Sequence, residues 1–183
     1  DHDHSRIEIY SDIADSYWIL KKYDQSAINY KKRIDAAPDK ATISNWNAYG
    51  MALFLNKDYA AADSAFTKIT IMDPQNPAGW FRRGQANAYM DKDMKSDSAR
   101  IFYEKFYDLA ITDKDKNKKD LVKACKYLAG YQYVQKNYAC SKAYWQMILT
   151  LEPTDNDAKK QLDDPQLKNA ATVDVGTCKK GGK

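Results

Sequence analysis

Hydrophobic positions in the stretch 43–76 recur three or four residues apart, in two runs that a short polar segment separates. The first run is Trp46, Tyr49, Gly50 and Leu53, and the second run is Ala62, Phe66 and Ile69. This spacing places each run on one face of an α-helix. Residues 56–58 form a turn, and Pro74 ends the second helix because proline cannot continue it. The pattern predicts an antiparallel helix pair.

Two small residues, Gly50 and Ala62, fall where the two helices of this pair must cross. Their lack of side-chain bulk allows the two backbones to approach closely. We therefore expect Phe66 and Trp46 to fill the space at the two ends of the crossing.

Three further segments repeat the same spacing. Four positions lie 36 residues before their counterparts in the stretch 43–76, namely Tyr10, Ala14, Tyr23 and Pro38. Five positions lie 79 residues after theirs, namely Ala129, Tyr138, Ser141, Trp145 and Pro153. In the remaining copy Trp80 and Gly84 lie 34 residues after Trp46 and Gly50, but the second helix is displaced by three residues, which places an insertion within 91–97. This copy opens with Asn76 as N-cap and Pro77 as first helical residue.

The repeats predict one all-α domain over 7–163. Its parts are the repeats 7–42, 43–76, 77–121 and 122–155 and a capping helix over 156–163. Residues 1–6 are predicted to be disordered and 164–183 to form an irregular tail. The segment 112–120 is predicted to be a charged connector.

These residues resemble the tetratricopeptide repeat (TPR) family. Its 34-residue signature is matched here by Trp46, Tyr49-Gly50, Leu53, Ala62, Phe66 and Pro74, with Ile69 larger than the usual alanine. The resemblance implies a right-handed α-solenoid whose concave face binds other proteins. The segments Ala88–Asp91 and Tyr103–Phe106 are also similar to a subset of TPR proteins from Bacteroidetes-type bacteria, many of which are exported. We therefore expect a location in the periplasm or cell envelope, with the cytoplasm as the alternative.

In TPR folds the first helix of each repeat lines the concave wall. Projected onto this sequence, those positions are Ser11, Asp15 and Trp18; Ser44, Asn47, Met51 and Phe54; Phe81, Arg82, Gln85 and Ala88; Lys123, Lys126 and Tyr133. The resemblance implies that partner contacts come from Trp18, Asn47, Met51, Phe54, Phe81, Arg82, Gln85, Lys126 and Tyr133. Aromatic, amide and cationic side chains mixed in this way suit an extended or helical peptide. Trp18 and Phe54 have an alternative role in packing between repeats.

Composition agrees with an all-α chain and limits the partners. The chain has 14 Tyr but only seven Gly and five Pro, which leaves few places for β-hairpins. The 29 basic and 25 acidic residues give a net charge of +4, too balanced to predict nucleic-acid binding from charge alone. No apolar run is long enough to span a membrane.

The three cysteines are predicted to be small buried thiols or, for Cys178, a thiol in the tail. Cys125 and Cys140 fall on opposite helices of one hairpin and are displaced along it, which is poor geometry for a disulfide.

The repeats lack the common catalytic arrangements, and although acidic residues are abundant, their spacing favours no catalytic carboxylate pair over surface charge. No histidine follows His4, so neither a Ser/His nor a Cys/His arrangement can form there. No glycine-rich phosphate loop is present, and the cysteine spacing fits no zinc module. Asp113, Asp115 and Asn117 begin like a calcium loop, but Lys118 and Ala124 stand where that loop needs Gly and Glu. We expect no enzyme, no cofactor and no metal.

The sequence therefore favours a non-catalytic interaction scaffold that is a monomer or weak oligomer. Some TPR domains hold chaperone C-termini with a clamp of Lys, Asn, Asn, Lys and Arg. Whether the first three or the last three repeats are aligned with it, this sequence matches one of the five positions, so no such tail is an expected partner. One alternative is a basic adaptor for nucleic acid or an anionic surface, using Lys114 to Lys123. Another is a spacer or self-association module of a longer chain.

Overall fold

The computed structural model describes residues 2–179, and in this part of the chain every regular element is helical. The chain divides into two compact units, one ending at Met90 and one beginning at Asp91. The boundary falls inside the predicted repeat 77–121, between its two helices. The prediction of an all-α fold is confirmed.

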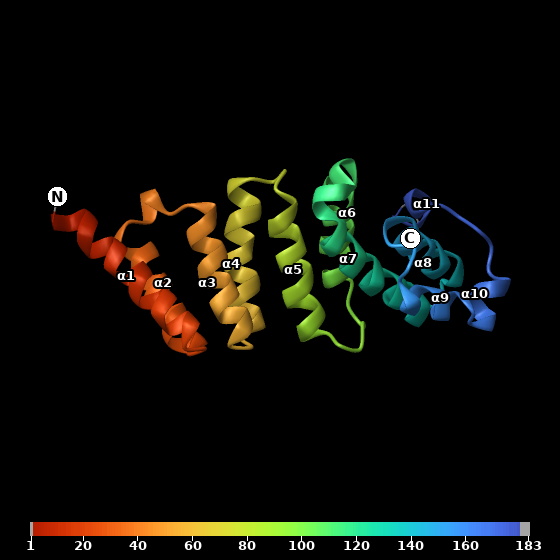
Figure 1. Ribbon diagram of the computed structural model, residues 1–183, viewed down its shortest axis with the longest axis horizontal. Coiled ribbons are helices and arrows are strands. Elements are labelled where there is room, and N and C mark those ends of the chain that lie inside the picture. The colour runs from red at the N-terminus through yellow and green to blue at the C-terminus, as the bar shows by residue number, and fades with distance from the viewer. Residues whose placement is uncertain (1, 180–183) are drawn as a thin grey trace. The chain divides into compact units, whose positions relative to one another are not determined.

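The first unit consists of successive antiparallel helices (Figure 1). Its elements are α1 (His2–Ile19), α2 (Tyr23–Ala36), the short 3-10 helix η1 (Pro38–Lys40), α3 (Ile43–Leu55), α4 (Tyr59–Met72) and α5 (Pro77–Met90). Helices α1 and α2 pack as one hairpin and α3 and α4 as a second, while α2 packs on α3 and α4 on α5. Helices α2, α3 and α4 therefore each bury one face inside their hairpin and another against a neighbouring helix outside it.

Local side chains set where these helices begin. Thr42 and Asn45 form a reciprocal capping box at the start of α3, and the Asp58 carboxylate accepts the N–H of Ala61 at 3.2 Å at the start of α4. At the start of α5, Asn76 Oδ1 accepts the N–H of Ala78 at 3.0 Å, so the predicted N-cap is confirmed.

The turn inside three of the hairpins has one backbone form. Lys21, Lys57 and Lys136 occupy equivalent positions in the left-handed region, with φ of 57°, 67° and 61°. In the second hairpin the N–H groups of Lys57 and Asp58 donate to the carbonyls of Phe54 and Leu53, both at 3.0 Å. These bonds satisfy carbonyls that the end of α3 leaves free.

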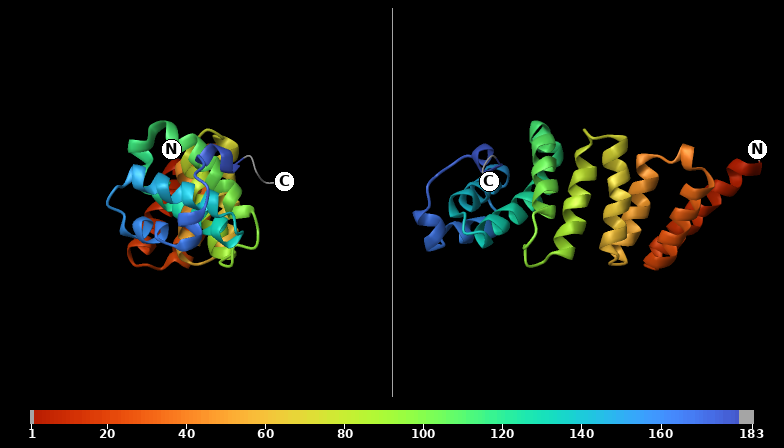
Figure 2. Two further views of the ribbon diagram at one scale, coloured as in Figure 1. Left: turned by 90° about the vertical axis from the view of Figure 1, so that its right-hand side faces the viewer. Right: turned by 180° about the vertical axis from the view of Figure 1, so that it is seen from behind.

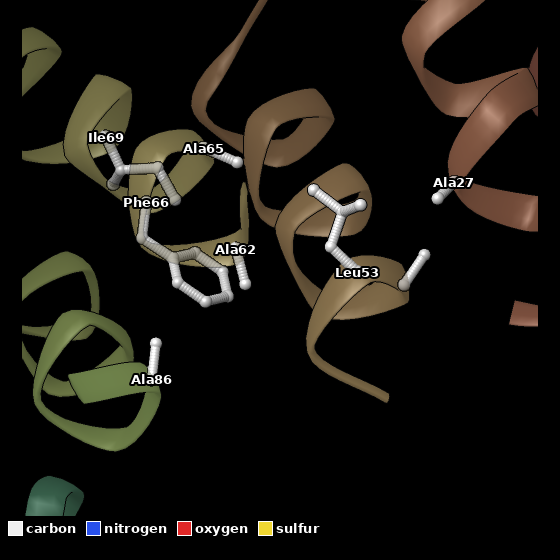
Figure 3. Close-up of a cluster of buried hydrophobic side chains, with 8 residues drawn as sticks. Ala27, Leu53, Ala62, Ala65, Phe66, Ile69 and Ala86 are labelled. Carbon is white, nitrogen blue, oxygen red and sulfur yellow. The ribbon is translucent and has the colours of Figure 1, made fainter. Parts of the chain in front are cut away.

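The core of the first unit is centred on Phe66. Figure 3 shows its ring pointing from α4 toward Ala62 and Ala86, with Ile69 and Ala65 on the same helix and Leu53 on α3. Phe66 and Ala62 are both 0% exposed. A β-carbon on Gly50 would lie 2.5 Å from Phe66 Cε1, so the ring occupies the space that glycine leaves. Helices α3 and α4 therefore pack as the predicted pair, but Phe66 lies against Gly50 itself and does not fill one end of the crossing as we expected.

The second unit contains the longest helix of the chain. Its elements are α6 (Ser98–Ala110), η2 (Ile111–Asp113), α7 (Lys114–Val134), α8 (Tyr138–Leu151), α9 (Asn156–Leu162), α10 (Pro165–Asn169) and α11 (Val175–Lys179). Helices α7 and α8 pack as a hairpin, seen from behind in Figure 2 (right), and α6 packs on α7 while α9, α10 and α11 pack on α8.

The segment 112–120 is not the connector that we expected, because η2 and the first turns of α7 include it. The Asp113 carboxylate accepts the N–H of Lys116 at 3.4 Å and starts the helix. Lysine has a high helix propensity, so this charged stretch extends α7 without burying a face.

The tail is also more ordered than predicted. Cys140 on α8 and Cys178 on α11 form a disulfide with Cα atoms 5.4 Å apart, so the expectation of three free thiols was wrong for these two. Leu167 and Val175 are buried at 0% and 6% exposure. Lys142 donates to the carbonyl of Ala170 at 2.9 Å. The disulfide and these contacts hold residues 164–179 against α8.

At the other end, helix α1 begins at His2, within the segment predicted to be disordered. Extending a helix that is already packed adds one hydrogen bond for each residue fixed, and nucleation is not repeated. Residues 1 and 180–183 lie outside the described part of the chain, and so does the outer end of both the predicted disordered N-terminus and the predicted irregular tail.

Candidate functional site

A groove opens in the first unit where α1, α2 and α3 meet, and we call it the α1–α3 groove. It has a volume of about 490 Å³. Its lining residues are Asp15, Trp18 and Ile19 of α1, Tyr30 of α2, and Asn47, Ala48 and Met51 of α3. Four of these, Asp15, Trp18, Asn47 and Met51, lie on the wall that the sequence predicted.

Helical spacing brings these side chains to one place. Asp15, Trp18 and Ile19 are three and four residues apart and share a face of α1, and Asn47 and Met51 share a face of α3. Ala48 lies beside Asn47 and is small, which leaves room between the two helices.

The walls are mainly apolar. Trp18 and Met51 are partly buried and pack against the hydrophobic core. The Trp18 ring meets Tyr23 edge to face, with centroids 5.5 Å apart, which holds the indole in place. Ile19 is 78% exposed, an unusual degree for a large aliphatic side chain beside a groove.

The polar end of the groove consists of Asp15 and Tyr30. The Tyr30 hydroxyl donates a hydrogen bond to Asp15 Oδ1. Partial burial raises the pKa of Tyr30 well above its usual value, and the bond to Asp15 raises it further. Tyr30 is therefore neutral at physiological pH. No ion pair to Asp15 is found among the described residues.

Three predicted site residues on α5 lie outside the groove. Phe81 is 2% exposed, so its ring is not displayed on the surface. The Arg82 guanidinium lies 6.0 Å from the Phe81 ring centroid and donates to Gln85 Oε1 at 3.0 Å.

Phe54 lies in an aromatic cluster at the end of α3. Its ring meets Tyr59 at 5.3 Å and Tyr89 at 5.2 Å, both edge to face, while Tyr59 and Tyr89 stack at 4.9 Å. Trp18 with Tyr23 and Tyr133 with Tyr138 repeat the Phe54–Tyr59 pair in the other hairpins. This aromatic pair joins the end of one helix to the start of the next.

The remaining two predicted site residues lie in the second unit and have partners there. Lys126 pairs with Asp155 at 2.8 Å and Asp157 at 2.9 Å, and these hydrogen bonds raise its pKa. Tyr133 donates to Asp164 at 3.3 Å. Both side chains connect α7 to the segment that follows α8.

Three residues of the groove were missed by the sequence projection. Ile19 and Ala48 are each next to a predicted residue, and Tyr30 lies on the second helix of the first repeat, whereas the projection considered only first helices. Ile19 carried a signal, because an isoleucine beside Trp18 extends the apolar surface beyond the face that α1 buries.

The basic stretch from Lys114 to Lys123 forms the N-terminal turns of α7, where its lysines are exposed while Leu121 and Val122 are buried. Asp115 and Asp120 are interspersed among its lysines, and Lys123 pairs with Asp120 at 3.2 Å. In residues 2–179 no helix is both long and apolar enough to cross a membrane. Among residues 7–179, whose side chains are described, no group of three His, Cys, Asp or Glu side chains is placed to hold a metal ion.

Comparison with known proteins gives a similar fold. The crystal structure of the C-terminal part of a TPR repeat-containing protein from Cytophaga hutchinsonii matches with a TM-score of 0.83 and 28% sequence identity, covering 88% of this chain and 62% of that chain. The chain thus spans about three fifths of that solved chain. No protein-family profile matches the sequence, and neither does any curated protein. The predicted likeness to TPR proteins of Bacteroidetes bacteria is confirmed.

Proposed function

We propose that this chain, which is a TPR-like helical-repeat protein, binds a segment of a partner protein in the α1–α3 groove and does so without catalysis. The TPR-like fold is that of a protein-interaction scaffold. The observation that supports a site in this groove is the convergence of Trp18, Met51 and exposed Ile19 around polar Asp15 and Asn47.

The groove has the two kinds of contact that peptide recognition needs. Apolar side chains supply buried area, and a small number of polar groups set orientation. Trp18 is already fixed by Tyr23, so little side-chain freedom is lost when a partner covers it.

The experiment is a selection from a phage-displayed library of random twelve-residue peptides on the immobilised full chain. Affinities of the selected peptides are then measured by fluorescence polarisation for the wild type and for Ala48→Arg, which places a long side chain in the groove. Ser64→Arg is the matched control, because it adds the same side chain at an exposed position of α4.

We expect Ala48→Arg to weaken binding by at least about ten-fold, since the side chain competes for the peptide's place. Ser64→Arg should leave the affinity within about two-fold. Equal affinities for Ala48→Arg and the wild type would refute this site. Binding that falls steeply with salt, and that is unaffected by Ala48→Arg, would instead support the basic adaptor.

A further inference from the structure

The lining of the α1–α3 groove is acidic although the protein as a whole is basic. Asp15 is the one side chain among the described lining residues that is charged at neutral pH, and neither lysine nor arginine lines the groove. The net charge of the chain is +4. A ligand entering the groove therefore meets a local charge opposite to that of the protein.

The rest of α1 adds to this negative charge. Residues 7–19 contain Glu8, Asp12 and Asp15 and no basic residue. Glu8 is paired with Arg33 at 3.5 Å, whereas no described side chain forms an ion pair with Asp12 or Asp15. The two lysines that follow the helix, Lys21 and Lys22, are exposed in the turn and are not among the lining residues.

One oxygen of Asp15 is held in place and the other is available. Oδ1 accepts the hydroxyl of Tyr30, and Oδ2 receives no hydrogen bond from the described residues. An ionised carboxylate can accept about four hydrogen bonds. Because the bond from Tyr30 orients the group in advance, a donor can reach it at small entropic cost.

The walls beside Asp15 suit a long aliphatic stem. Trp18, Ile19 and Met51 provide apolar surface next to the carboxylate. Lysine and arginine place their methylene groups on such a surface and their charge at a polar end. The face of an indole ring attracts a cation and adds to the binding free energy. A purely apolar side chain would cover Asp15 without pairing it, which costs free energy. An acidic side chain would be repelled.

We propose that the α1–α3 groove binds a lysine or arginine side chain of the partner, with the cationic head on Asp15 and the stem against Trp18 and Met51. This inference rests on the proposed function and specifies the chemistry of the partner segment. The preferred segment is basic at this position and has apolar neighbours that contact Ile19.

The test uses a peptide selected on the wild type and a synthetic copy in which its basic residue is replaced by norleucine, which keeps the stem and removes the charge. Both peptides are titrated by fluorescence polarisation against the wild type, Asp15→Asn and Asp12→Asn. Asp12→Asn is the matched control, because it removes the same charge from α1 outside the groove lining.

We expect loss of the charge from the peptide to weaken binding to the wild type by about ten-fold or more, as for a charge-assisted hydrogen bond. The same replacement should change binding to Asp15→Asn by less than about two-fold, because the partner of the charge is gone. Asp12→Asn should respond to the replacement as the wild type does.

Other outcomes separate this inference from the proposed function. Peptides that lose binding with Ala48→Arg, but that lack basic residues or bind Asp15→Asn as tightly as the wild type, would overturn the basic-side-chain inference and leave the groove as the site. Failure to select any peptide that is sensitive to Ala48→Arg would overturn both.

Discussion

Substitution of Gly50 by alanine tests the packing at the centre of the first unit. The added β-carbon would lie 2.5 Å from Phe66 Cε1 and 2.8 Å from Cδ1, whereas carbon atoms in contact are normally about 3.5–4.0 Å apart. Phe66 is 0% exposed, with Ala62 and Ala86 beside its ring (Figure 3), so the ring has little room to move away.

Two effects of opposite sign determine how much Gly50→Ala changes the free energy of unfolding. Overpacking of this kind costs roughly 1–3 kcal/mol. Alanine gains about 1 kcal/mol over glycine inside a helix. We therefore expect Gly50→Ala to lower the free energy of unfolding by about 1 kcal/mol, and Gly50→Leu to lower it by more, because the larger side chain deepens the overlap.

The assay is urea denaturation followed by far-UV circular dichroism. Urea midpoints are compared between variants whose unfolding free energies have the same dependence on urea concentration. Gly130→Ala is the control, since a β-carbon there would meet only the end of the Met94 side chain, at an ordinary 3.5 Å from Cε, and should raise stability by about 0.5–1 kcal/mol. Phe66→Leu should make Gly50→Ala less harmful in the double variant. A Gly50→Ala protein as stable as Gly130→Ala would refute the reasoning.

Four further predictions concern other parts of the chain. Lys57→Gly should raise the free energy of unfolding by about 0.5–1 kcal/mol in the same urea assay, because it relieves a left-handed φ of 67°, while Lys57→Val should lower it. Cys178→Ser removes a disulfide with a sequence separation of 38 and should lower the free energy of unfolding by roughly 3–4 kcal/mol. A reductant should lower the stability of the wild type by the same amount and leave that of Cys178→Ser unchanged. Native protein should react slowly with a thiol reagent, because burial raises the pKa of Cys125 to about 12; rapid labelling would contradict its placement. Lys116→Ala, on the exposed start of α7, should leave the urea midpoint nearly unchanged.

The sequence predicted the parts of the fold that depend on neighbours along the chain. Helical spacing of Trp46 with Gly50, and of Ala62 with Phe66, was sufficient to predict that α3 and α4 form a packed pair. It did not predict that the Phe66 ring lies against Gly50. The cap at Asn76 was found in the same way, because a cap bonds only two or three residues ahead.

The predictions that were wrong concerned segments in which hydrophobic residues do not recur at regular spacing. Residues 114–120 form a helix through lysine propensity and the Asp113 cap, and neither leaves an apolar pattern to detect. The pairing of Cys140 with Cys178 was missed because it depends on how the tail returns to α8, which spacing cannot show.

By itself the sequence determined that the chain is a series of helical hairpins, because helix period, caps and turns are local and repeat along it. Only the tertiary structure decided which exposed side chains share a surface. It brought Asp15, Tyr30 and Met51 from three helices to one groove, and it held Lys126 and Tyr133 on the acidic residues that follow α8. The physical reason is that such contacts join residues far apart in the chain, and the packing of the helices fixes their distances.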